Sequence, residues 1–177
     1  VLYAMTVHTK FFNNYAGNTL FDKLKGIASQ MTTFDRFLAV VGFFRSSGYF
    51  KLRRELGDIS EIKILVGINI DDIFRKHNKA LLMLADEEKA KEIYHDGFKE
   101  DIVSAQYSPE VEEGILQMCD DLVSGRLQMR IHATKNLHAK FYLCLPQNHS
   151  EHSDGWVIMG SSNISDSGLG IKQPPQY

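Results

Sequence analysis

The sequence has little of what marks membrane-spanning, secreted or zinc-binding proteins. Its 177 residues include only two cysteines, four prolines and one tryptophan. No apolar run approaches the ~20 residues that span a bilayer, and the first residues do not form a signal peptide. Neither a CxxC nor an HExxH spacing occurs. We therefore expect a cytoplasmic protein that uses no metal or other cofactor and does not insert into a membrane.

The few candidate metal ligands have simpler interpretations. Cys119 lies in an expected helix and Cys144 in an expected buried strand, where both are interpreted as reduced core thiols. His149 and His152 stand three apart in a polar loop that also contains acids. A solvated loop is the interpretation that we adopt, because short spacings of this kind recur by chance.

Positive charge is not in overall excess, since the net charge is −2. This balance argues against a protein that coats nucleic acid non-specifically. The charges are nevertheless segregated. The segment 45–54 carries four basic residues and no acid, whereas 86–121 carries twelve acids against three lysines. One basic surface of this kind suits a polyanion approaching from one side, although a charged run is usually a solvated helix face.

Hydrophobic periodicity and capping residues predict an α/β domain with a mixed sheet flanked by helices. A short helix follows the cap Asn18-Thr19, and Ser46-Ser47-Gly48 begins a helix that Gly57 ends. The predicted strands are 34–44, 61–68, 127–131, 139–145 and 156–159, and further helices are predicted at 71–85, 87–104 and 109–124. The chain lacks an initiator methionine and a closing element, so we expect one domain, 1–177, cut from a longer protein.

Two short motifs near the end of the chain carry the chemistry. His138-Ala139-Lys140 stands at the start of an apolar run, and Gly160-Ser161-Ser162-Asn163 follows a predicted strand. If 137–145 is a strand, its period of two places His138 and Lys140 on one face. Two buried polar side chains without a partner would cost several kcal/mol, which a shared anion would offset. The motifs together predict a phosphate-binding cleft.

Other histidines near lysines are weaker candidates. His8-Thr9-Lys10 also matches HxK, but no GSxN-like turn follows it, and we interpret it as coincidence. His132 precedes Lys135 by three positions instead of two. It lines the cleft or is a partly buried core histidine, and the sequence leaves both options open.

The segments 137–142 and 160–165 together resemble the HKD half-site of the phospholipase D superfamily. More narrowly, they are similar to the phospholipase D-like domains of bacterial restriction endonucleases and to those at the N-terminus of some superfamily 2 helicases. The segment 40–48 also resembles the strand-to-helix entry of those domains. The resemblance implies a phospholipase D-like single half-site domain, with DNA as its partner and a helicase or specificity domain C-terminal to it.

The resemblance also implies a mechanism without a metal. His138 would attack phosphorus and form a phosphohistidine. Lys140 and Asn163 would bind the non-bridging oxygens, and Ser161 would assist from the turn. A second histidine from an identical half-site would protonate the leaving oxygen. Since the chain has one credible half-site, the resemblance implies a homodimer.

Two positions depart from the family pattern. The acid often found five residues after the lysine is replaced by Leu145, and the only acid after Asn163 is Asp166, which we expect to be exposed and close to the turn. A residue that orients His138 is therefore not identified. These departures keep a second hypothesis open, a half-site that binds DNA without cutting it. A lipid-acting phospholipase is a third hypothesis, which the lack of a basic amphipathic helix and of a second half-site disfavours.

Further phosphate contacts are predicted near the start of the second helix. Ser46 and Ser47 stand where a helix N-terminus can bind phosphate, and Arg45 is a candidate contact to the DNA backbone. Ser162 is a candidate from the GSSN turn. An ordinary helix cap and an ordinary tight turn are the competing interpretations of these segments.

Overall fold

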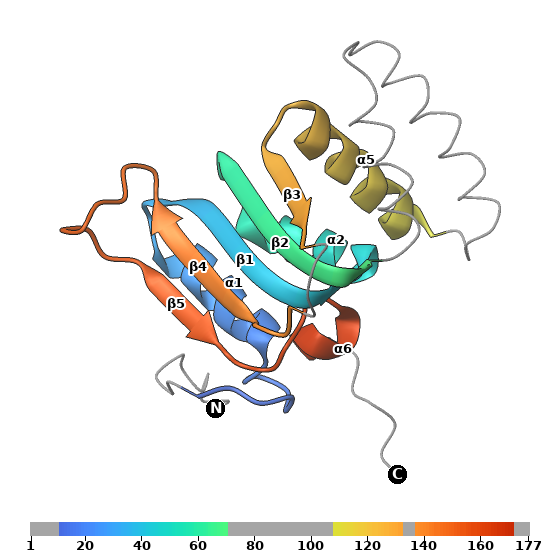
Figure 1. The fold of residues 1–177 in the computed structure, drawn as a ribbon, viewed down its shortest axis with the longest axis horizontal. Helices are drawn as coiled ribbons and strands as arrows, with labels where there is room; N and C mark the ends of the chain where they lie inside the picture. The colour runs from blue at the N-terminus through green and yellow to red at the C-terminus, as the bar shows by residue number, and fades with distance from the viewer. Residues whose placement is uncertain (1–10, 71–107, 133–136, 172–177) are drawn as a thin grey trace, which may run out of the picture.

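The computed structural model describes residues 11–70, 108–132 and 137–171, and these form a single five-stranded sheet with helices packed on it (Figure 1). The strand order is β3-β2-β1-β4-β5. The strands are β1 (Phe34–Phe44), β2 (Glu61–Ile70), β3 (Leu127–Ile131), β4 (Phe141–Pro146) and β5 (Trp156–Met159).

The sheet is mixed, which confirms the predicted α/β fold class. Strands β1, β2 and β3 run parallel, whereas β4 runs antiparallel to β1 and β5 antiparallel to β4. The long loop between β4 and β5 projects from the left of Figure 1. The turn that follows β5 therefore lies at the opposite end of the hairpin from this loop.

Four helices are described: α1 (Leu20–Gln30), α2 (Ser46–Leu56), α5 (Pro109–Val123) and the short α6 (Asp166–Leu169). Figure 1 shows α1 and α2 lying behind the sheet. Side-chain burial alternates along β1. Phe37, Ala39 and Val41 are at most 3% exposed, while Leu38 and Val40 are half-buried. This period of two places one apolar face of the sheet against the helices.

Several helix boundaries agree with the sequence, and one cap does not. Thr19 caps α1 in a complete capping box with Asp22. The helix α2 begins at Ser46 and is followed by Gly57, whose φ of 68° suits glycine. Its N-cap is Arg45, whose side chain makes no capping hydrogen bond, so the expected serine cap is wrong.

The remaining helix predictions have different outcomes. The helix α5 is confirmed with Ser108 as its cap, and α6 was not predicted. The predicted helices 71–85 and 87–104 and the motif at His8 lie outside the described residues.

Both cysteines are free. Cys144 is 1% exposed and Cys119 is half-buried. Burial raises the pKa of each thiol to about 12, so both are neutral near pH 7. Cys144 belongs to the core, as expected, and Cys119 packs against it. Among the described residues, no helix has the length and apolar character needed to cross a bilayer.

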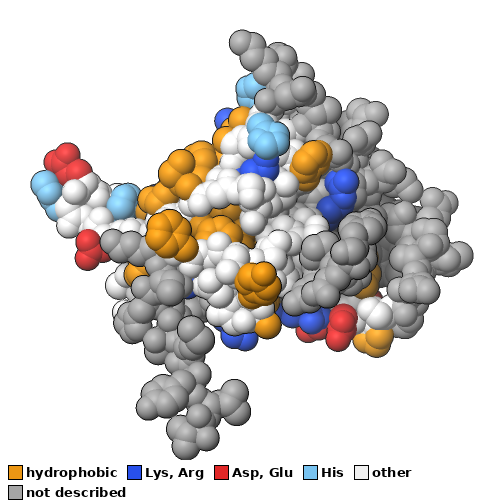
Figure 2. Space-filling view, turned by 90° about the horizontal axis from the view of Figure 1, so that it is seen from below, with side chains coloured by type: hydrophobic (Ala, Val, Ile, Leu, Met, Phe, Trp, Pro, Cys, Tyr) orange, Lys and Arg blue, Asp and Glu red, His pale blue; other side chains and the backbone are white. Residues whose placement is uncertain are grey.

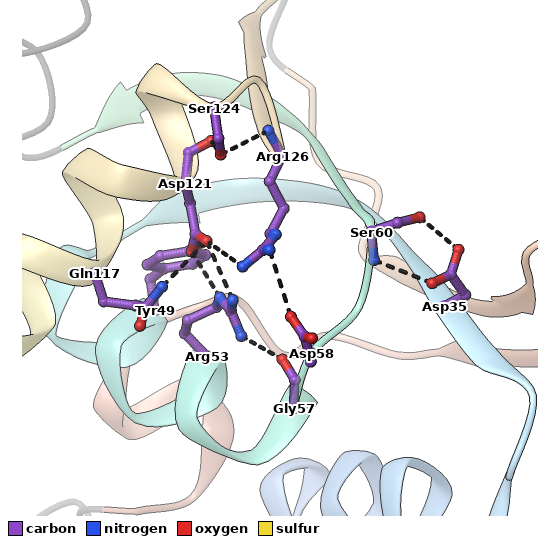
Figure 3. Close-up of polar contacts among 10 residues, drawn as sticks. All are labelled: Asp35, Tyr49, Arg53, Gly57, Asp58, Ser60, Gln117, Asp121, Ser124 and Arg126. Atoms are coloured by element: carbon purple, nitrogen blue, oxygen red, sulfur yellow. Dashed lines mark hydrogen bonds and ion pairs between the residues drawn. The ribbon is translucent and has the colours of Figure 1, made fainter.

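A buried carboxylate joins α2 to α5 (Figure 3). Asp121 is 1% exposed and accepts hydrogen bonds from Arg53 Nε at 2.6 Å and from the Tyr49 hydroxyl at 3.0 Å. Gln117 and Arg126 also donate to it. Burial, together with the negative charge of Asp121, raises the pKa of Tyr49 well above its usual value. This network anchors α2, whose N-terminus begins directly beside the candidate site.

Candidate active site

The GSSN turn is tied to the start of β4. The backbone N–H of Gly160 donates to the carbonyl of Lys140 at 3.2 Å. The hydroxyl of Tyr142, on β4, donates to the carbonyl of Ser162 at 2.6 Å. Tyr142 is only 1% exposed, so this bond is made in the core and fixes the turn beside the HxK segment.

The same turn continues along the end of β1. Ile164 forms a parallel bridge with Phe44, and its carbonyl accepts the backbone N–H of Arg45 at 2.8 Å. A Cβ on Gly48 would lie 2.7 Å from Ser165 Cα, so only glycine permits α2 to approach this segment so closely. The end of β1, the start of β4 and the GSSN turn therefore meet at one place.

The strand that was predicted to carry His138 and Lys140 begins only at Phe141. Both residues precede β4, so their placement on one strand face is wrong. His138 is exposed whereas Lys140 is only 6% exposed, so the two do not share one environment as residues two apart on a strand would. The two side chains meet all the same, because Lys140 Nζ lies 3.1 Å from His138 Nδ1.

Lys140 is a buried ammonium with neutral partners. Its Nζ donates to the His138 carbonyl at 2.8 Å and contacts His138 Nδ1. Within the described segments no carboxylate lies within ion-pair distance of this Nζ. A buried charge without a counter-charge is costly, and an anion bound beside it would compensate that cost.

Gly42 on β1 marks the point where the side chains converge. A Cβ placed on Gly42 would lie 3.4 Å from Lys140 Nζ and 3.5 Å from Asn163 Oδ1. The backbone carbonyl of Leu137 would lie 3.2 Å from the same point. Lys140 and Asn163 thus share one neighbourhood, which a side chain at position 42 would crowd.

The amide of Asn163 is oriented by the backbone of β1. Its Oδ1 accepts the N–H of Gly42 at 3.1 Å and the N–H of Phe43 at 2.9 Å, beside the bulge between Val41 and Phe43. Two donors on one atom identify that atom as the oxygen. The amino group Nδ2 has no protein acceptor within the described residues. It is available as a donor to a ligand.

The contact between Lys140 and His138 determines which ring nitrogen carries a proton. An ammonium has donors only, so Nδ1 accepts from Lys140 and the proton of the neutral ring lies on Nε2. A histidine that attacks through Nε2 needs its proton on Nδ1 instead. The contact must therefore open before His138 can act as a nucleophile through Nε2.

No orienting acid is found at His138. In the part of the chain that the structure describes, its ring has one hydrogen-bond partner, Lys140. Asp166 pairs with Lys51 at 2.9 Å, and its side chain is 17% exposed. The expectation that Asp166 is exposed is wrong, because this ion pair half-buries it against α2.

The remaining predicted contacts differ in accessibility. Ser161 is exposed on the turn, Ser162 is half-buried, and Ser47 is exposed on the first turn of α2. Ser46 is 1% exposed, so its hydroxyl is inaccessible to a DNA backbone. Arg45 is half-buried and donates from NH1 to the Phe44 carbonyl at 3.0 Å.

The other histidines that the structure describes are His132, His149 and His152. His132 is half-buried. In the loop after β4, His149 Nδ1 contacts Ser153 Oγ at 2.9 Å, and His152 lies beside Glu151. Across the described ranges, no cluster of three or more His, Cys, Asp or Glu side chains is arranged to hold a metal.

Gly42 and Tyr142 are site residues that the motifs did not identify. A glycine inside the β-branched and aromatic run 40–44 is a signal for close backbone approach. The sequence therefore indicated that another segment approaches Gly42, but it did not indicate which one. Nothing in the sequence indicated a role for the Tyr142 hydroxyl, because its hydrogen-bond partner is a backbone carbonyl twenty residues away.

Comparison with known proteins adds no relative to this picture. No protein-family model matches this chain. No curated protein matches it either.

Proposed function

We propose that this domain is a metal-independent phosphodiesterase that acts on DNA through a phosphohistidine at His138. The observation that carries the proposal is the buried Lys140 ammonium, which lacks a counter-charge in the described part of the chain and contacts the ring of His138. Asn163 lies beside it with a free amide donor. A cation, a donor and a histidine at one place suit a phosphodiester anion.

The geometry supports an ordered sequence of events. A phosphodiester oxygen that binds Lys140 draws the ammonium away from His138 Nδ1, which can then take up the ring proton. The Nε2 lone pair attacks phosphorus, so a P–N bond forms and the P–O bond to the leaving group breaks. Asn163 Nδ2 donates to a non-bridging oxygen, and Ser161 is exposed on the same turn. Water later cleaves the P–N bond and frees His138.

The leaving oxygen needs a proton that this half-site does not supply. We propose that a second copy of the chain provides it from its own His138, which makes the active enzyme a homodimer. The restriction, defence or helicase-linked context implied by the resemblance is part of the same proposal.

A second candidate function is DNA binding without cleavage. It is favoured by one observation, the contact of His138 Nδ1 with a cation where an orienting carboxylate would be expected. In that case Lys140 and Asn163 would hold a phosphate, and His138 would remain a proton donor through Nε2.

The test is cleavage in excess EDTA of DNA and of the small diester bis(p-nitrophenyl) phosphate. We expect hydrolysis that resists the chelator and falls by at least about 10³-fold in His138→Ala, since the nucleophile is lost. The matched control is His152→Ala, which removes a histidine that is 85% exposed in the loop at the other end of the β4–β5 hairpin. It should cleave like the unmodified protein.

Equal cleavage by His138→Ala and the unmodified protein would overturn the proposal. If neither protein cleaves but both bind DNA, and Lys140→Ala abolishes binding, the second candidate function is correct.

A further inference from the structure

The segment just before α1 packs beside the GSSN turn. Phe12 lies over Gly160, because a Cβ placed there would be 3.1 Å from Phe12 Cζ. The segment is held in a turn by the backbone bond from Asn13 N–H to the Asn18 carbonyl at 2.8 Å. Tyr15 N–H also donates to Asn13 Oδ1 at 3.0 Å. The packing brings an aromatic segment close to the candidate site.

A pocket of about 270 Å³ lies between this segment and the turn. Phe11, Asn13 and Asn14 line one side, and Met159 and Ser161 line the other. Phe11 is 84% exposed and Met159 is 75% exposed. The pocket is small beside the ~300–1,000 Å³ of sites for drug-sized ligands. It therefore suits one flat ring better than a larger ligand.

We propose that this pocket stacks one base of a single-stranded nucleic acid whose phosphodiester lies at His138 and Lys140. Exposed aromatic side chains stack on bases, and amide groups such as those of Asn13 and Asn14 match the polar edges of a base. Ser161 belongs to both the pocket and the GSSN turn, so the pocket adjoins the turn that carries Asn163. A duplex keeps its bases paired and stacked, and it cannot place one here without opening.

A lipid is the alternative occupant, because exposed apolar side chains continue along β5 to Val157 and Trp156. Figure 2 shows hydrophobic side chains gathered beside the projecting loop, which carries acidic side chains and histidines. Acids at this position oppose binding to an anionic lipid surface. The asparagine amides in the pocket also suit a base better than an acyl chain. The observations therefore favour the nucleic acid.

This inference rests on the proposed function, and its test separates the two. Binding is measured in the His138→Ala background, which prevents cleavage, with a single-stranded oligonucleotide and a hairpin duplex of the same sequence. Adding Phe11→Ala should weaken single-strand binding by about 5-fold to 100-fold, which corresponds to the loss of one stacked base. Duplex binding should change less than twofold. Phe11→Tyr should restore the single-strand affinity, because it keeps a ring.

The matched control is Leu116→Ala, which truncates a side chain on α5 that is 53% exposed and contributes nothing to the pocket. It should leave both affinities unchanged. Equal effects of Phe11→Ala on single strand and duplex, or no effect on either, would overturn the inference. So would a loss of binding to phosphatidylcholine vesicles instead of to the oligonucleotide. Hydrolysis of bis(p-nitrophenyl) phosphate by the unmodified protein reports the proposed function separately.

Discussion

At the scale of single residues, Asn163 has a structural role through its amide oxygen and a proposed chemical role through its amino group. Its oxygen accepts the backbone N–H groups of Gly42 and Phe43, and its amino group is left to face a ligand. The N–H of Gly42 is buried, so the loss of its acceptor would cost about 1–3 kcal/mol. The two roles can therefore be separated by chemistry at a single position.

We expect Asn163→Asp to keep the fold and lose the chemistry. A carboxylate still accepts both backbone N–H groups, but it has no donor and adds a negative charge beside the substrate. Hydrolysis should fall by about 10²-fold or more, while the free energy of unfolding changes by less than about 1 kcal/mol. Initial rates and urea unfolding measure the two quantities.

Two further variants serve as comparisons for Asn163→Asp. Asn163→Ala should lose both hydrolysis and stability, because the buried N–H loses its acceptor. Asn148→Asp adds the same charge at an exposed position in the far loop and should change neither. Retained hydrolysis in Asn163→Asp would show that the amide is not a phosphate ligand.

At the scale of elements, the position of α2 depends on the buried network around Asp121 (Figure 3). Arg53 donates to both carboxylate oxygens and from NH1 to the Gly57 carbonyl, and its side chain is only 8% exposed. Burial opposes the charge of Arg53, but its hydrogen bonds to Asp121 outweigh that effect and raise its pKa. The pair ties α2 to α5 through charges that neither helix could bury alone.

We expect Asp121→Ala to destabilise the protein by about 3–5 kcal/mol, because it leaves the Arg53 guanidinium buried and unpaired. The control is Glu113→Ala, which breaks the Arg54–Glu113 ion pair between the same two helices, where the side chains are 43% and 75% exposed. That loss should be below about 1 kcal/mol. Urea unfolding followed by circular dichroism compares them. Similar costs for the two variants would mean that the buried network does not anchor α2.

At the scale of the whole molecule, the histidine of the proposed half-site, His138, is exposed. If it is the nucleophile, it is accessible to a second copy of the chain as well as to substrate. A composite site would explain why the leaving-group acid is missing from each half, and it makes activity depend on pairing.

Subunit mixing tests this dependence. Unmodified protein equilibrated with a ninefold excess of His138→Ala should lose about tenfold of its activity, because random pairing gives most subunits a partner without His138. The same excess of Leu116→Ala, which keeps His138, should instead raise the total activity about tenfold, since every subunit then has an active partner. Activity that follows only the amount of unmodified protein would contradict a shared site.

The sequence by itself determined the elements that depend on neighbouring residues. The local pattern of residues predicted β3 and β5 at their observed bounds, and Thr19 and Ser108 cap the helices that follow them. These features arise from periods of 2 and 3.6 and from caps within three residues, so a single segment contains the whole signal. The resemblance to a phospholipase D half-site remains a prediction, made on two short motifs.

Tertiary structure alone decided how the site is assembled. Asn163 meets the backbone of Gly42 across 121 positions of sequence, and Lys140 is buried while His138 two residues earlier is exposed. The start of β4 at Phe141 overturned the strand-face argument, since pairing with β1 ends at Val40. Such contacts depend on register, bulges and packing between distant segments, which no local pattern encodes.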